Sequence, residues 1–168
     1  MLDYAALPDE EIENRAALDE PGALYEKGDR LLNKGELACA RKYLTLSSIL
    51  GNRDAHMRLG RICEDEDNIE EAYNLYALAW GKGLDNALPR LARMLMHSDK
   101  RLGIDILKTH AHEGNADCVR ELIDIFKKET SAAAKKELAL YKSLLRDLTG
   151  KDEDADKPQP QDGTDEAK

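Results

Sequence analysis

The chain has 168 residues, of which 42% are hydrophobic and 5% aromatic, and its formal net charge is −9. This length and apolar content are typical of a folded domain with a core, whereas the acidic balance argues against nucleic-acid binding and against binding to an anionic membrane, because both attract basic proteins. No apolar run approaches the roughly 18 residues of a membrane span, and no signal peptide is readable. Three cysteines without CxxC spacing favour reduced thiols in a cytoplasmic protein.

Helices are predicted one after another along the chain, with short turns between them. A short helix is expected near 9–18, within an N-terminal extension of residues 1–22. Residues 23–150 are predicted to form a repeat domain of helix pairs. The first helices of the pairs are expected at 22–34, 54–64, 86–97 and 117–129, and the second helices at 36–50, 68–82, 99–113 and 131–148. The last of these is strongly amphipathic, which suits a helix that caps the end of an array.

Three segments of equal length, 40–60, 72–92 and 103–123, align with one another. Their central glycines are Gly51, Gly83 and Gly114, which follow one another at nearly equal intervals. In the second segment Ala72, Tyr76 and Ala79 stand at offsets of zero, four and seven, which places them on one face of a helix. Small side chains on such a face let two helices approach closely, so these positions are predicted to be helix contacts.

The turns between the predicted helices carry matching signals. The three central glycines can end a helix in the left-handed conformation. Asp67 with Glu70 reads as a capping box, and Pro89 falls in a first turn, where its missing N–H costs nothing. The candidates for capping the helices that follow the glycines are Asp54, Asp85 or Asn86, and Asn115 or Asp117.

The pattern resembles the Sel-one-like repeat, a relative of the tetratricopeptide repeat. The matching residues are Ala72, Tyr76, Ala79, Gly83 and Ala87 in the second copy, and Ala40, Gly51, Ala55 and Gly60 in the first. Trp80 replaces a family alanine, and the family's glycine-rich loop is missing. The resemblance implies an all-α, right-handed α/α solenoid of about four antiparallel helix pairs. It also implies a protein–protein interaction function, with the first helix of each pair lining a concave groove.

Arginines recur in register on the first helices. Arg58 and Arg61 of one copy are matched by Arg90 and Arg93 at the equivalent places of the next, and Arg120 follows on the helix after that. Guanidinium groups bind carboxylates through two parallel hydrogen bonds. Met57 and Met96 lie near them in sequence and would add adaptable apolar contacts. Together these residues predict a groove for an acidic or extended peptide. The alternative is that the arginines are solvated and pair locally, for instance Arg61 with Glu64 or Asp65.

Residues 151–168 differ in character from the rest of the chain. They hold seven acidic residues and three lysines, with no aliphatic side chain larger than alanine. Such a segment cannot bury enough apolar surface to offset its chain entropy, so a disordered acidic tail is predicted. The stretch Asp152–Asp156 is a candidate intramolecular ligand of the arginine groove, because a tether raises its effective concentration.

No motif for catalysis, a cofactor or a metal is found. The acidic stretch 64–71 lacks the alternating ligands and the glycine of a calcium loop. His110 and His112 point to different faces of a helix, and convergence of His97, His110 and Cys118 on a metal is the remaining alternative. The sequence thus favours a non-catalytic adaptor or scaffold. A small secretion chaperone or regulator is one alternative, and a helical enzyme or metalloprotein is another.

Overall fold

The computed structural model describes residues 2–150, so the predicted acidic tail lies outside the described residues. Within residues 2–150 every regular element is a helix, which confirms the all-α prediction for this range. No helix there is long and apolar enough to cross a membrane. In chain order the elements are η1 (Tyr4–Ala6), α1 (Asp9–Ala16), α2 (Pro21–Asn33), α3 (Leu37–Ile49), α4 (Arg53–Asp65), α5 (Ile69–Gly81), η2 (Asp85–Ala87), α6 (Leu88–Leu95), α7 (Lys100–His112), α8 (Ala116–Lys127) and α9 (Ala132–Thr149).

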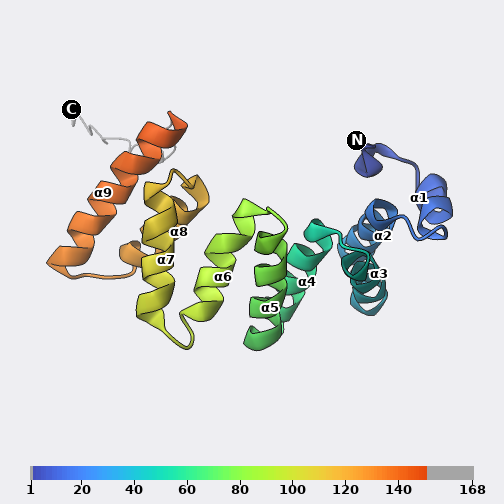
Figure 1. The fold of residues 1–168 in the computed structure, drawn as a ribbon, viewed down its shortest axis with the longest axis horizontal. Helices are drawn as coiled ribbons and strands as arrows, with labels where there is room; N and C mark the ends of the chain where they lie inside the picture. The colour runs from blue at the N-terminus through green and yellow to red at the C-terminus, as the bar shows by residue number, and fades with distance from the viewer. Residues whose placement is uncertain (1, 151–168) are drawn as a thin grey trace, which may run out of the picture.

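The helices follow one another along the longest axis of the molecule, from α1 at one end to α9 at the other (Figure 1). Each helix from α1 to α9 packs against the next one in the chain, and α6 also touches α8. The pairs α2–α3, α4–α5, α6–α7 and α8–α9 occupy the places of the four predicted helix pairs. Contacts are therefore local in sequence, and each pair depends on its neighbours to cover its apolar faces.

Among the predicted helices, the one at 86–97 differs most in its bounds from the helix in the structure. Residues Asp85–Ala87 form the 3-10 helix η2, and α6 covers only Leu88–Leu95. Pro89 stands in the first turn of α6, as expected. Because proline has no N–H to donate to the carbonyl four residues back, the chain before it closes a tighter turn, in which the Ala87 N–H donates to the Leu84 carbonyl.

At the turns, the three glycines take the predicted left-handed conformation, but some of the predicted N-cap residues do not cap a helix. Gly51, Gly83 and Gly114 all have positive φ, between 80° and 95°. Asn115 caps α8 as expected. Asn52, not Asp54, caps α4, because it stands directly before the first turn and its side chain accepts the N–H groups of Asp54 and Ala55. The expected capping box at Asp67 is also wrong. Asp67 itself takes a left-handed turn conformation, with φ of 59°, and Asn68 caps α5 instead.

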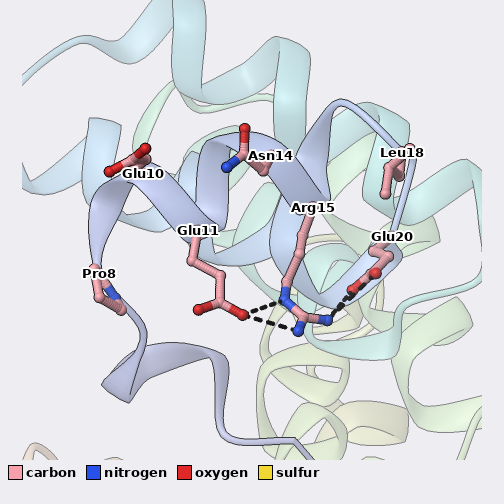
Figure 2. A pocket seen from close by; sticks show the side chains of 7 residues that line it. All are labelled: Pro8, Glu10, Glu11, Asn14, Arg15, Leu18 and Glu20. Carbon is pink, nitrogen blue, oxygen red and sulfur yellow. Dashed lines mark hydrogen bonds and ion pairs between the residues drawn. The ribbon is translucent and has the colours of Figure 1, made fainter.

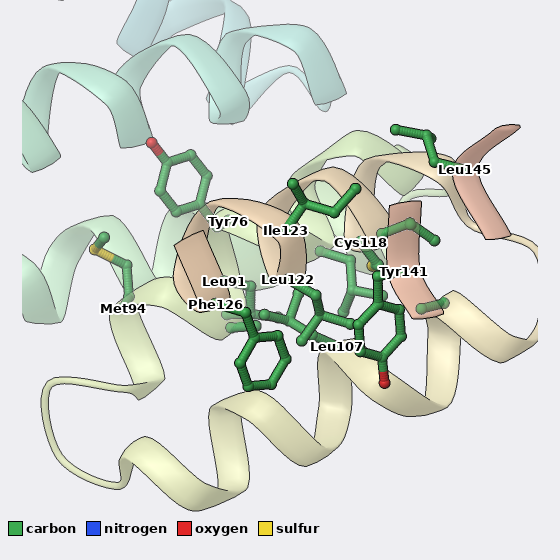
Figure 3. Packing of buried hydrophobic residues seen from close by; sticks show 14 of the residues in the cluster. Tyr76, Leu91, Met94, Leu107, Cys118, Leu122, Ile123, Phe126, Tyr141 and Leu145 are labelled. Atoms are coloured by element: carbon green, nitrogen blue, oxygen red, sulfur yellow. The ribbon is translucent and has the colours of Figure 1, made fainter. Parts of the chain in front are cut away.

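The main hydrophobic core runs through the second half of the array (Figure 3). Its large buried side chains come from five helices, so no pair has a core of its own. They include Tyr76, Leu91, Leu107, Leu122, Phe126 and Tyr141. The rings of Phe126 and Tyr141 stack with their centroids 5.9 Å apart, which fixes α9 on α8.

Glycine allows close helix contacts at two equivalent places. A Cβ atom on Gly60 of α4 would lie 2.7 Å from the Tyr76 ring of α5, and one on Gly28 of α2 would lie 2.7 Å from the Leu44 side chain of α3. Gly60 and Tyr76 stand 32 residues after Gly28 and Leu44, respectively. The predicted small face of α5 is likewise buried, with Ala72, Tyr76 and Ala79 fully covered.

Gly60→Ala should lower the free energy of unfolding by about 1–3 kcal/mol, because the added methyl group overpacks the Tyr76 ring. Gly81→Ala is the matched control, since a Cβ at this helical glycine meets no atom within 4 Å. It should instead stabilise the protein by about 0.5–1 kcal/mol through the better helix propensity of alanine. Urea unfolding followed by circular dichroism measures both, and equal effects of the two variants would contradict the contact.

The N-terminal extension packs on α2. The Tyr4 ring lies against Gly22, where a Cβ would come within 2.2 Å of it. Arg30 of α2 donates to the backbone carbonyls of Tyr4, Ala5 and Leu7. The predicted boundary between the N-terminal extension (1–22) and the repeat domain (23–150) falls inside the first turn of α2.

Candidate interaction surface

Two of the predicted groove arginines belong to a half-buried ion network. Glu64 of α4 accepts hydrogen bonds from the Tyr76 hydroxyl of α5 and from Arg90 Nη1 of α6, the latter at 2.9 Å. Arg93 Nη1 lies 3.3 Å from the other Glu64 oxygen, and Arg93 Nε donates to Glu121 of α8 at 2.9 Å. The network thus ties four helices together. Its arginines already have carboxylate partners within the chain.

The protonation states of this network follow from its contacts. Burial raises the pKa of the Glu64 carboxyl, but the Tyr76 hydrogen bond and the charges of Arg90 and Arg93 outweigh burial, and the pKa lies below its usual value. Burial, the hydrogen bond to Glu64 and the Glu64 charge all raise the pKa of Tyr76. At neutral pH the carboxylate is therefore ionised and the phenol donates to it.

The other predicted groove residues differ in their surroundings. Arg58 forms an ion pair with Asp29 of α2, and its Nε is buried without a hydrogen-bond partner in the described chain. Arg120 pairs with Asp117 on the same helix, with 2.6 Å between Nη1 and the carboxylate oxygen. Arg61 is exposed and has no ion pair within residues 2–150. Neither of its expected local partners pairs with it. Glu64 pairs with arginines of α6 instead, and Asp65 forms no ion pair within residues 2–150.

The two predicted methionines are half-buried. Met57 packs against the main core. Met96 covers Gly103 of α7, where a Cβ would come within 2.3 Å of its Cγ. Both side chains therefore contribute to packing between helices, and a role in binding a ligand stays a prediction.

Two cavities lie on either side of the turn between α4 and α5; we call them the first and second edge cavities. The first has a volume of about 310 Å³ and is lined by Leu32, Leu37, Arg58, Arg61, Ile62, Asp65 and Glu66. The second has a volume of about 410 Å³ and is lined by Ile69, Glu70, Tyr73, Met94, Leu95, His97 and Ser98. Four lining positions of the first, namely 37, 62, 65 and 66, have counterparts in the second 32 residues later, at 69, 94, 97 and 98. Nothing in the sequence indicates either cavity beyond the repeat itself.

A larger hollow of about 630 Å³ lies beside α1, lined by Pro8, Glu10, Glu11, Asn14, Arg15, Leu18 and Glu20. Figure 2 shows its one arginine, Arg15, held between Glu11 and Glu20. The Arg15 guanidinium is thus already neutralised by two carboxylates.

Two of the histidines and two of the cysteines are engaged in packing, whereas Cys39 and His97 are exposed. His56 is buried, with Nδ1 2.6 Å from the Ser48 hydroxyl oxygen, and burial followed by the Lys82 charge lowers its pKa. His110 contacts Trp80 edge to face. Burial, together with Asp117 and Glu121, raises the pKa of the Cys118 thiol to about 12, so it is not a reactive thiolate. Among residues 2–150 no group of three or more metal-ligating side chains is arranged to hold an ion.

Comparisons with protein-family models, with curated proteins and with solved structures give no match to this chain. The resemblance to the Sel-one-like repeat therefore depends on the residue pattern alone and stays a prediction.

Proposed function

We propose that this chain is a non-catalytic protein–protein interaction module, built as a right-handed tetratricopeptide-like array that binds an extended segment of a partner protein. The observation that carries the proposal is the recurrence of one cavity at equivalent places of two neighbouring helix pairs. Equivalent cavities along an array offer equivalent attachment points to an extended chain. The equivalent glycine contacts at Gly28 and Gly60 support the same repeat register.

Most of the predicted groove arginines already pair with carboxylates of the chain itself, and these pairs compete with binding of an acidic ligand. A ligand carboxylate at Arg58, Arg90, Arg93 or Arg120 would have to replace a carboxylate of the chain itself. At Arg58, Arg90 and Arg93 this displacement leaves a half-buried carboxylate of the chain unpaired, which costs free energy, whereas the Arg120–Asp117 pair is exposed. Arg61 keeps an accessible guanidinium, so the prediction of an acidic ligand is best tested there.

Affinity capture with the purified full-length chain as bait, followed by mass spectrometry and reconstitution from purified components, tests the proposal. We expect the captured partner to be reducible to a segment of about twenty residues that binds nearly as well as the whole partner, because an extended chain of that length can follow the array. A partner that binds only as a folded domain would contradict the proposal. Stoichiometric zinc in the purified protein would favour the metalloprotein alternative.

A further inference from the structure

The turn between α4 and α5 forms a wall shared by the two edge cavities. Asp65 and Glu66 line the first cavity on one side of the turn, and Ile69 and Glu70 line the second on the other. A ligand that enters both cavities must therefore cross this turn. The chemistry of the turn decides what such a ligand carries between its two anchoring points.

Three carboxylates in the turn and in the helix ends beside it have no cationic partner in the described chain. Asp65, Asp67 and Glu70 are exposed and form no ion pair within residues 2–150, whereas Glu66 pairs with Arg41. The turn itself is well defined, because Asn68 caps α5 and its amide donates to Glu71 at 2.7 Å. The unpaired carboxylates therefore stand on a fixed segment of backbone.

The cavities on both sides have apolar walls that reach the surface. Leu37 is 44% exposed beside the buried Ile62 in the first cavity, and Tyr73 is 38% exposed beside the buried Met94 in the second. The first cavity also holds two arginines, of which Asp29 neutralises Arg58. Among the described residues of this edge, Arg61 is then the single arginine without an ion-pair partner, against three such carboxylates.

We propose that this edge binds a partner segment that is extended and carries two apolar side chains with lysine or arginine between them. Each apolar side chain enters one edge cavity, and the cationic group meets the carboxylates of the α4–α5 turn. The anchors should be about three to six residues apart, if one to two helix packing distances of about 8–10 Å separate the cavities and an extended chain rises about 3.3 Å per residue. This inference rests on the proposed function and specifies its ligand.

The probe is a set of fluorescein-labelled synthetic peptides with two leucines separated by three to six residues. In one series the spacer is rich in lysine, and in the matched series glutamate replaces each lysine. By fluorescence anisotropy with the full-length protein, we expect the best lysine peptide to bind at least about tenfold more tightly than its glutamate counterpart, with affinity falling as salt rises. Equal binding of the two series, or preference for glutamate, would overturn the inference.

Surface variants locate the binding site. Asp65→Lys with Glu70→Lys should weaken the lysine peptide by about tenfold or more, while Asp147→Lys, at an exposed carboxylate on α9, should not. Tyr73→Ser should weaken it, whereas Leu78→Ser, which changes a side chain 51% exposed on the same helix, should not. Circular dichroism checks that each variant keeps its fold. Equal losses from a variant and its control would also overturn the inference.

Arg61→Glu separates this ligand from an acidic one. It should strengthen binding of the lysine peptide, because it replaces the unpaired cation that lines the first edge cavity with a carboxylate, and unchanged or weaker binding would overturn the inference. The failure of the inference is also distinguishable from that of the proposed function. If a captured partner segment binds the wild type and the doubly substituted turn equally well, the array is still an interaction module, and its binding surface lies elsewhere.

Discussion

Replacing Tyr76 with alanine should lower the free energy of unfolding by about 3–5 kcal/mol, the range for deleting a large buried ring. Tyr76 is fully buried, and its ring fills the space that Gly60 leaves open on α4. The variant would therefore leave a cavity between the two helices of one pair. It would also remove the hydroxyl that donates to Glu64.

Two further substitutions separate the ring from the hydroxyl. Tyr76→Phe keeps the ring and should cost only about 1–2 kcal/mol, because Glu64 retains its arginine partners. Tyr73→Ala, at a partly exposed tyrosine on the same helix, should cost less than about 1 kcal/mol. Chemical unfolding at pH 7 gives all three values. A loss for Tyr76→Ala no larger than that for Tyr73→Ala would show that the contact with Gly60 is not tight.

The helix pairs could be predicted because their signals are local and repeated. The glycines at 51, 83 and 114 mark helix ends through backbone conformation alone, and they do take positive φ. The spacing of Ala72, Tyr76 and Ala79 predicts one buried face, and that face is buried. Each such signal depends on a few neighbouring residues, and its recurrence at a nearly constant interval removes ambiguity about register.

The capping residues were predicted less well, because several polar residues near each turn can cap a helix. Asn52 and Asp54 both precede the apolar face of α4, and the chain uses Asn52. Asp67 and Asn68 compete at α5, where Asp67 takes the left-handed position and leaves the cap to Asn68. The capping residue depends on where the helix begins to within one or two residues, and the residue type alone does not determine that position.

The partners of the arginines could not be predicted, because they lie on other helices. Glu64 stands 26 residues before Arg90, and Glu121 stands 28 residues after Arg93. A charge on one helix finds its partner through the packing of whole helices, so sequence spacing predicts only that the arginines recur. The edge cavities share this property, since each is formed by residues from neighbouring helix pairs.

Glu64 therefore has a structural role that the sequence did not indicate. It is the acceptor shared by Tyr76 of its own pair and by Arg90 and Arg93 of the next pair. Hydrogen bonds from a charged donor to a half-buried carboxylate stabilise more than those between neutral groups. A single carboxylate thus links α6 to both helices of the α4–α5 pair.

Glu64→Gln should lower the free energy of unfolding by about 1–3 kcal/mol at pH 7, because the neutral amide no longer attracts the two guanidinium groups. The effect should depend on pH. The pKa of Glu64 is lowered in the folded protein from its usual value of 4.5. A carboxyl group with a lowered folded pKa stabilises the fold fully above its unfolded pKa, and this contribution is lost as pH falls through the folded pKa. The difference between wild type and Glu64→Gln should therefore be largest near pH 7 and shrink below pH 4.5.

Glu129→Gln is the matched control, since Glu129 pairs with Lys100 at 3.1 Å but the two side chains are 38% and 65% exposed. An exposed ion pair of this kind contributes about 0–1 kcal/mol, so its removal should change stability little at any pH. Urea unfolding of the three proteins at several pH values between 3.5 and 7 gives the comparison. A Glu64→Gln effect that is independent of pH would mean that the Glu64 charge is not what holds α6, and that apolar packing of α6 against α5 holds it instead.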